Sequence, residues 1–354
     1  MTKKNKQRSK TSSNTSTSSS ENLPPPPKVV LRTYRDTDWQ QVDYLFKSTQ
    51  IPLVYESIRS KLWAFPTWVI WFAVYSSLLI LIPRFITTYI AREVPQWAMT
   101  VVKIATTFVW AVIAFAILFI TSDRVETQNR VDEALANDLK DPLTYYLNYT
   151  AVEDKENPGR LKRIPKPENE HVPSHFWVLT LDDELCGMIG LQCNPVDVQD
   201  QRATVPVAWK QFIVAVLELF RSPFIPSFLL KEKPNTEPHD KTKRKIFAHK
   251  QIPKTATITR WAVRSDLQTC GFSTLLLNRA MMWADEHDIN RVYAMTNECC
   301  MAAEQILTKR HGFVIMKRYN LNFFGQYQKL FGCRVKEWME KNAEKTRKVF
   351  NKKE

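Results

Sequence analysis

Two long runs without a charged residue stand out in the pattern of apolar and polar positions. Residues 62–83 read LWAFPTWVIWFAVYSSLLILIP, and residues 104–122 read IATTFVWAVIAFAILFITS. At about 1.5 Å rise per residue, each run would reach roughly 30 Å as a helix, which matches the hydrocarbon thickness of a bilayer. Because a soluble helix of this length normally keeps a polar face, the runs predict a transmembrane hairpin with spans 62–83 and 97–122. A pair of buried core helices is the alternative.

On both sides of this hairpin, apolar residues recur at the short spacings that are typical of helices and strands in a soluble fold. Residues 29–50 predict a first strand over 29–35 and a helix over 36–48, because Val42, Leu45 and Phe46 have helical spacing. The remainder of the fold is expected over residues 123–325. Its predicted elements are a helix over 125–147 that breaks near Pro142, a strand hairpin over 175–181 and 185–193, a strand over 256–263, a helix from Ser273 to His287, a strand over 291–297 and a helix over 299–310.

Residues 195–253 read as an insertion into this pattern. The insertion contains one apolar piece, residues 208–220, followed by segments rich in proline and lysine. The apolar piece is too short to cross a bilayer. It would either lie on a membrane surface or pack on the fold, and the sequence favours neither.

The net charge of +14 is concentrated in two tails. Residues 1–28 carry six Lys/Arg against one Glu and include TSSNTSTSSS, which predicts a disordered, basic tail rich in Ser, Thr and Pro. Residues 326–354 predict a basic, helical C-terminal tail. Such tails are either attracted to anionic headgroups or simply solvated. Since no nucleic-acid-binding fold accompanies the charge, we expect no nucleic-acid partner.

The six cysteines predict free thiols in a reducing compartment. They lack a repeated CxxC, and no Cys/His set has the spacing of a zinc site. We therefore expect no bound metal, and no structural disulfide at the adjacent Cys299 and Cys300.

The most informative stretch, residues 256–287, combines a strand, a short loop and a helix. The N-terminus of a helix presents unpaired backbone N–H groups and the positive end of the helix dipole, which together favour anionic phosphates. Gly271 and Ser273 are small enough for the loop backbone to approach a pyrophosphate closely.

The loop Gln268-Thr269-Cys270-Gly271-Phe272-Ser273 resembles the Q/R-x-x-G-x-G/A acetyl-CoA loop of the GNAT superfamily of N-acetyltransferases, with Ser273 in place of the usual Gly or Ala. The segments 291–297, 299–310 and 311–319 resemble the family's strand, helix and "GF" strand. The apolar hairpin after the first strand and helix resembles the membrane-anchored subfamily that includes cysteine S-conjugate and aspartate N-acetyltransferases. This resemblance implies an α+β fold, a mixed central sheet flanked by helices, with an inserted transmembrane helical hairpin.

The resemblance also implies an activity and a binding site. The activity is acetyl-CoA-dependent N-acetyl transfer, with a small-molecule or protein amine attacking the thioester directly. Backbone groups of Ala262 and Val263 would hold the pantetheine. Residues around the loop would hold the pyrophosphate, namely Gln268, Cys270, Gly271, Ser273 and Thr274.

The general base and acid are less clearly indicated. Strand 256–263 contains no carboxylate, so Glu298 is the nearest candidate base; its alternative role is a helix N-terminal acid that favours the dipole. Thr308 stands where many relatives have a Tyr acid. Cys299 and Cys300 are interpreted as small buried residues rather than nucleophiles, and Tyr293 as a residue packed in the sheet. Arg260 would either attract an anionic substrate or be a surface strand residue.

Because the general base and acid are not clearly indicated, a second function stays open: a catalytically inactive GNAT-fold membrane protein that senses acetyl-CoA or binds a partner. In either case we expect an integral protein of the endoplasmic reticulum or another internal membrane, with the catalytic domain facing the cytosol, where acetyl-CoA and reduced thiols are found. Asn148-Tyr149-Thr150 is a glycosylation acceptor pattern, and a glycan there would place the domain in the lumen instead.

Overall fold

A seven-stranded mixed sheet forms the centre of the computed structural model, which describes residues 27–90, 95–153, 161–205, 207–219, 225–236 and 243–350. The strands lie in the order β1 (Val29–Thr33), β4 (His175–Leu181), β5 (Glu184–Gln192), β10 (Thr255–Val263), β11 (Arg291–Asn297), β13 (Tyr327–Arg334) and β12 (Val314–Asn320). Only β10 and β11 pair in parallel, and all the other neighbours in this sheet are antiparallel.

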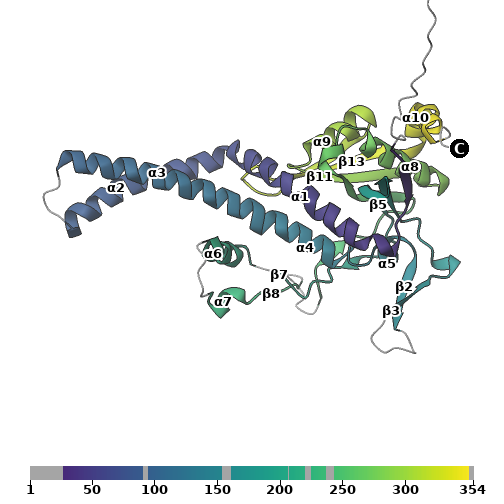
Figure 1. The fold of residues 1–354 in the computed structure, drawn as a ribbon, viewed down its shortest axis with the longest axis horizontal. Helices are drawn as coiled ribbons and strands as arrows, with labels where there is room; N and C mark the ends of the chain where they lie inside the picture. The colour runs from purple at the N-terminus through teal and green to yellow at the C-terminus, as the bar shows by residue number, and fades with distance from the viewer. Residues whose placement is uncertain are drawn as a thin grey trace, which may run out of the picture.

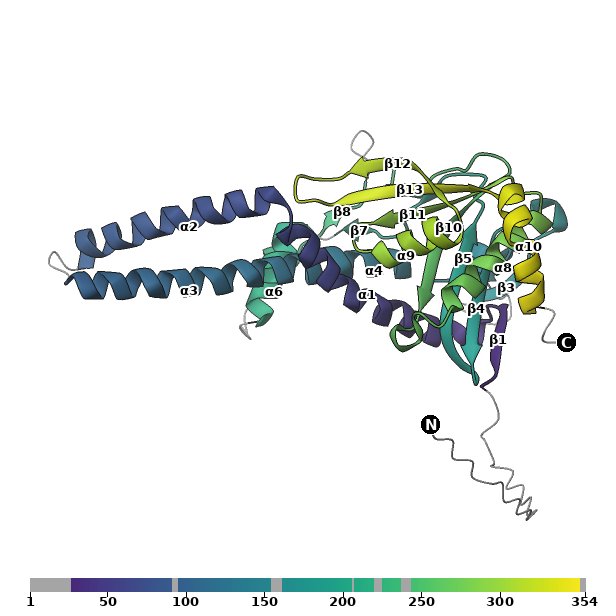
Figure 2. The same ribbon diagram turned by 90° about the horizontal axis from the view of Figure 1, so that it is seen from above.

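Helices cover both faces of the sheet (Figures 1 and 2). On one face, α8 (Phe272–Glu286) and α10 (Val335–Phe350) enclose a core that includes Leu276, Met281 and Phe331. On the other face, α1 (Trp39–Leu62), α4 (Gln128–Ala136) and α5 (Pro142–Tyr146) enclose a second core around Leu139 and Phe176. Along β4, residues alternate between these two cores, as expected for a strand buried on both sides. The predicted fold class, a mixed central sheet flanked by helices, is confirmed.

The remaining elements lie around the sheet and in the 195–253 segment. They are β2 (Tyr149–Glu153) with β3 (Leu161–Pro165), β6 (Val198–Gln199) with β9 (Ile246–Ala248), β7 (Thr204–Val205) with β8 (Lys233–Pro234), α6 (Ala208–Leu219), α7 (Ser227–Leu230), α9 (Met301–Gln305), the 3₁₀ turns η1 (Asp36–Asp38), η4 (Glu168–Glu170) and η5 (Ser265–Leu267), and the π-helical segments η2 (Ile86–Ile90), η3 (Thr121–Thr127) and η6 (Ile306–Arg310).

The two apolar runs form a helical hairpin that extends away from the sheet (Figure 1). Its helices are α2 (Phe65–Phe85) and α3 (Gln96–Ile120), and both are long and apolar enough to cross a membrane. Tyr75 and Thr107 form a hydrogen bond of 2.9 Å between the two helices, and the ring of Trp71 packs edge-on against that of Phe115. No residue in the most apolar window of α2 is buried, so the alternative of two buried core helices does not fit.

The first helix and the C-terminal segment differ from the sequence expectation. α1 continues beyond residue 48 to Leu62 and so joins the sheet to the hairpin. Residues 326–354 were predicted as a tail after the fold had ended at 325, yet β13 pairs with both β11 and β12 inside the sheet. Phe331 and Trp338 are almost fully buried. The sequence does not reveal this burial, because lysines and arginines at the exposed positions make the segment resemble a solvated tail. The predicted tail over 1–28 lies outside the described residues except for its last two.

Acidification is expected to weaken the contact between α10 and the rest of the fold. Trp338 Nε1 donates to His311 Nδ1 at 3.3 Å, which requires the neutral ring. Burial, with a smaller contribution from the Arg310 charge, lowers the pKa of His311 to about 4 from 6.5. The unfolded chain therefore binds more protons between pH 6.5 and pH 4, and the free energy of unfolding falls as the pH drops through this range, by up to about 1.4 kcal/mol per pH unit.

Thermal unfolding of the full chain and of a His311→Asn variant, measured at pH 7 and pH 5, checks this expectation. The asparagine keeps an acceptor near the position of Nδ1 but does not titrate, so its melting temperature should change less with pH. An equal change in both proteins would contradict the role given to His311. His175, whose pKa burial also lowers to about 4, would supply the part of the pH dependence that persists in the variant.

Candidate active site

The parallel strands β10 and β11 separate partway along their length. Their paired residues run from Thr255 opposite Arg291 to Ile258 opposite Ala294, although β10 continues to Val263. The pairing of β10 with β5 shifts register between Ile258 and Arg260, which marks a bulge at this same point. Beyond the bulge, no strand in the described part of the chain pairs with the edge of β10 that faces β11. Ala262 and Val263, the residues predicted to hold pantetheine, lie on this edge.

A loop leads from the end of β10 directly into α8. Gly271 is the N-cap residue of α8 and has φ of +87°, and Thr269 has φ of +75°. A Cβ at Gly271 would meet no atom within 4 Å, so the backbone angle, and not crowding, favours glycine here. None of the residues that the structure describes caps this helix with its side chain, so the N–H groups of the first turn stay available. Ser273 and Thr274 belong to this turn, and the arrangement suits an anionic group.

Hydrogen bonds hold two side chains around this loop in place, those of Gln268 and Arg310. Gln268 Nε2 donates to the carbonyl of Val263 at 3.3 Å, which ties the loop back to the end of β10. Cys270 is exposed. Arg310, from η6, donates to Thr274 Oγ1 at 3.4 Å and so places a positive charge beside the first turn of α8. Sequence reasoning missed Arg310, whose only signal was its place at the end of a predicted helix.

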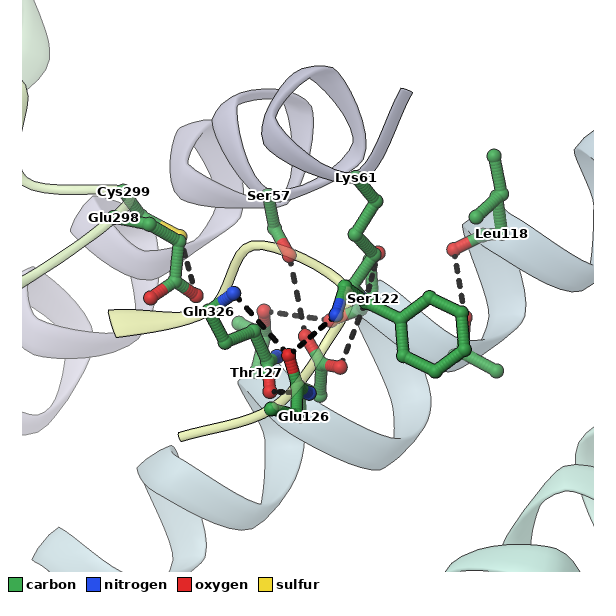
Figure 3. Close-up of polar contacts among 12 residues, drawn as sticks. Ser57, Lys61, Leu118, Ser122, Glu126, Thr127, Glu298, Cys299 and Gln326 are labelled. Carbon is green, nitrogen blue, oxygen red and sulfur yellow. Dashed lines mark hydrogen bonds and ion pairs between the residues drawn. The ribbon is translucent and has the colours of Figure 1, made fainter. Parts of the chain in front are cut away.

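Glu298 follows β11 directly and lies on the side of the sheet where the hairpin begins (Figure 3). Its side chain is buried, the backbone N–H of Tyr327 donates to Oε2 at 3.3 Å, and the Cys299 thiol donates to Oε1 at 3.7 Å. These contacts hold the carboxylate in one place, just after β11 and beside the start of β13. The carboxylate is therefore a fixed acceptor and not a mobile surface acid.

A second buried polar cluster lies near Glu298 where α1 meets η3 (Figure 3). Lys61 Nζ is 2.7 Å from Glu126 Oε1 and donates to Ser122 Oγ at 2.9 Å. Ser57 donates to the other Glu126 oxygen at 3.2 Å. Figure 3 also shows Gln326, from the loop before β13, beside Glu126. Because η3 is π-helical, Glu126 is displaced from regular helical phase at the point where α3 leaves the hairpin.

The adjacent cysteines are not nucleophiles in this arrangement. Burial raises the pKa of Cys299 to about 12 and also raises the pKa of Cys300, so both thiols stay protonated at neutral pH. The interpretation as a small buried residue agrees with the structure for Cys299, whereas Cys300 is only half-buried.

Arg260 fits neither of its two predicted roles. Its guanidinium holds Asp138 in a bidentate ion pair, with Nε to Oδ2 at 2.7 Å and Nη2 to Oδ1 at 2.6 Å. Tyr146 also donates to Asp138, at 2.6 Å, and its hydroxyl lies 2.7 Å from Thr259 Oγ1. Burial acts to lower the pKa of Arg260, but the Asp138 carboxylate outweighs it and raises that pKa. Arg260 is thus neither a surface residue nor free to bind an anionic substrate.

Two further residues are engaged as structural parts. Thr308 Oγ1 donates back to the carbonyl of Glu304 at 2.8 Å and stays within its own helix. Tyr293 packs in the sheet as predicted, where a Cβ at Gly332 would meet its ring at 3.2 Å. In the part of the chain that the structure describes, no group of three or more His, Cys, Asp or Glu side chains is arranged to hold a metal ion.

No family model and no curated protein sequence matches this chain. Solved structures do match. An acetyltransferase of the GNAT family from Staphylococcus aureus Mu50 is 9% identical, with 87% of this chain and 99% of that chain covered and a TM-score of 0.35.

Two other structures match over about half of this chain. The putative streptothricin acetyltransferase from Bacillus anthracis str. Ames, in complex with acetyl coenzyme A, is 17% identical, with 53% and 82% of the two chains covered and a TM-score of 0.28. The ribosomal-protein-S18-alanine N-acetyltransferase from Escherichia coli is 12% identical, with 55% and 86% covered and a TM-score of 0.27. Similarities this low do not by themselves assign a function to this chain.

Proposed function

We propose that this protein is a membrane-anchored N-acetyltransferase that uses acetyl-CoA as co-substrate. The observation that carries the proposal is the continuous path from the unpaired edge of β10, through the loop Gln268–Gly271, to the open first turn of α8. The edge offers backbone groups to an extended amide-bearing arm such as pantetheine. The first turn of α8, with Arg310 beside it, offers N–H groups and positive charge to a pyrophosphate.

For this reaction the protein has to orient the amine and the thioester and supply a base. The nitrogen of the amine attacks the thioester carbonyl carbon, a C–N bond forms, the C–S bond breaks, and the CoA thiolate leaves and takes up a proton. Backbone N–H groups on the free edge of β10 would stabilise the negative charge that develops on the carbonyl oxygen. An amine is mostly protonated at neutral pH, so a base must first remove a proton, directly or through water.

Glu298 is the proposed base, because it directly follows β11, the strand that separates from β10, and because its carboxylate is held in one place while β10 itself carries no carboxylate. Glu298→Gln keeps the size and hydrogen-bonding capacity but cannot accept the proton. We expect kcat to fall by about 100- to 10,000-fold while the affinity for acetyl-CoA stays unchanged.

Steady-state acetylation and calorimetric acetyl-CoA binding test this prediction, with Glu168→Gln on the exposed turn η4 as the matched control. Retention of full activity by Glu298→Gln would remove Glu298 from the mechanism. It would leave the carboxylate with the structural role of holding Tyr327.

The second candidate is a module that binds acetyl-CoA without turnover. Two observations favour it: β10 carries no carboxylate, and Thr308 occupies the position at which many relatives of the GNAT type have a tyrosine acid. An acetylation assay across a library of amines separates the two functions. Product with any amine supports the enzyme, whereas saturable acetyl-CoA binding without product from any amine supports the module.

We also propose that the α2–α3 hairpin spans an internal membrane, such as that of the endoplasmic reticulum, with the sheet on the cytosolic side. Asn148 supports this orientation because both polar atoms of its side-chain amide form hydrogen bonds with Val172. Nδ2 donates to the backbone carbonyl of Val172, and Oδ1 accepts from the backbone N–H of Val172, each at 2.9 Å. A glycan on Nδ2 would disrupt this contact. Detection of a glycan on Asn148 in cells would place the domain in the lumen and reverse the orientation.

A further inference from the structure

The turn between β12 and β13, Leu321–Gln326, presents large apolar side chains to the outside. Phe323 is 88% exposed, Leu321 is 55% exposed and Phe324 is 40% exposed. Three neighbouring apolar side chains on one short turn have no partner in the described part of the chain that removes them from solvent. Such clusters on a soluble surface mark a contact site.

Hydrogen bonds hold this turn in one shape, so the exposure does not come from an unstructured loop. Asn322 Oδ1 accepts from the backbone N–H groups of Phe324 and Gln326, at 3.0 and 3.2 Å. Asn322 Nδ2 donates to Gln326 Oε1 at 2.6 Å, and the N–H of Leu321 donates to the carbonyl of Gln326 at 2.9 Å. Gly325, with φ of +82°, allows the reversal. The side chain of Asn322 thus points inward, and the apolar side chains point away from the turn.

The turn lies where the hairpin begins. A Cβ on Gly325 would be 3.6 Å from Ala64 Cβ and from the Ser60 carbonyl. Ala64 is the N-cap residue of α2, so the exposed phenylalanines lie beside the first turn of an apolar helix. Trp63 and Phe65, which flank Ala64, are 83% and 77% exposed. Figure 2 shows the turn reaching toward the junction of α1 and α2. Aromatic residues at the end of a membrane span are typical of the interfacial layer.

A second group of exposed apolar residues lies at the base of the same hairpin, on α6 and α7. α6 packs against η3 and α3, and Trp209 on its surface is 54% exposed. Phe228 and Leu230 on α7 are 60% and 59% exposed. Lys210 joins the two helices through its hydrogen bonds to the carbonyls of Phe228 and Lys231, both 2.9 Å. The apolar segment that the sequence left undecided therefore packs on the fold and, with α7, exposes apolar side chains beside the hairpin.

We propose that the turn Leu321–Gln326 is a bilayer contact, which inserts Phe323 and its apolar neighbours into the layer between headgroups and acyl chains. A lipid surface fits better than a protein partner because the turn is continuous with the start of a span and because α6 and α7 supply a matching apolar group at the same hairpin base. The turn leads into β13, whose first N–H holds Glu298. The bilayer contact therefore lies directly beside the proposed base. The inference rests on the hairpin spanning the membrane, as proposed above.

A depth measurement on the full chain tests the contact. A spin-labelled amino acid is introduced by codon reassignment at position 323, which leaves the six native thiols in place, and the protein is reconstituted in vesicles of phosphatidylcholine and phosphatidylserine. Collision with oxygen, which concentrates in the acyl region, is compared with collision with a water-soluble nickel chelate. Matched labels at Phe108, 71% exposed on α3, and at Ile252, 69% exposed beside the opposite end of the sheet, report lipid and water respectively.

The contact predicts that label 323 resembles label 108, with oxygen accessibility exceeding that of the nickel chelate several-fold, while label 252 shows the reverse. If label 108 is in lipid but label 323 resembles label 252, the contact is absent and the anchoring stands. If label 323 is shielded from both reagents, a protein surface such as a second copy of the chain covers the turn, and the lipid contact is also wrong. If label 108 itself reports water, both the anchoring and the contact fail.

Discussion

A Gly271→Glu variant is expected to lose acetyl-CoA binding, with the dissociation constant raised at least about 100-fold, which corresponds to roughly 2.7 kcal/mol. A Cβ at Gly271 would meet no atom from the rest of the chain within 4 Å, so the new side chain has room beside the first turn of α8. A carboxylate in that space repels a pyrophosphate and occupies the N–H groups that would bind it. The φ of +87° adds about 1–2 kcal/mol of backbone strain for any residue other than glycine.

Calorimetric titration with acetyl-CoA measures this effect, and Gly271→Ala separates strain from charge. The alanine variant carries the same backbone strain without the carboxylate, so its melting temperature should fall as much as that of the glutamate variant. Its affinity should nevertheless fall less than about tenfold, because the open space in front of α8 stays free for the ligand. Tight binding by the glutamate variant would show that the pyrophosphate does not bind at this helix.

An Asp138→Asn variant is expected to lower the free energy of unfolding by about 3–5 kcal/mol, because it leaves the Arg260 charge buried without a counter-charge. Asp138 is fully buried and accepts from Arg260 twice and from Tyr146 once. The ring of Phe46 covers the guanidinium, with its centroid 5.3 Å away. The pair joins the end of α4 to the bulge of β10, so its loss would also loosen the strand edge proposed to hold pantetheine.

Thermal and denaturant unfolding in detergent measure this loss, and two matched variants make it specific. Glu337→Gln, which breaks the exposed ion pair with Arg334, should change the free energy of unfolding by less than about 1 kcal/mol. The double variant Asp138→Leu with Arg260→Met replaces the pair by apolar side chains and should recover much of the lost stability. A small effect of Asp138→Asn would mean that water or another carboxylate compensates the Arg260 charge.

The sequence predicted the parts of this protein that are local along the chain. The hairpin is visible because two runs lack charges for the length of a bilayer, and the path from β10 to α8 is visible because Gly271 and Ser273 lie together between a strand and a helix. Both signals need only the residues of one segment. Neither depends on how the segments meet in space.

The features that the sequence did not reveal depend on contacts between distant segments. Asp138 and Arg260 are separated by 122 positions, and no spacing rule connects an acid after one helix with an arginine at a strand bulge. Arg310 reaches Thr274 from a helix 36 positions away. The sequence predicts a tail at β13 because the segment from residue 326 onward is rich in Lys and Arg, and only pairing with β11 and β12 shows that it is part of the sheet.

Hydrogen exchange of the full-length protein, measured with and without acetyl-CoA, tests the central claim most directly. The account predicts that saturating acetyl-CoA slows exchange of the amides from Ala262 to Leu275, along the free edge of β10 and the first turn of α8. The amides of β2 and β3, which lie outside the proposed site, should keep their rates. Unchanged exchange over residues 262–275 at millimolar acetyl-CoA would contradict the proposed co-substrate site.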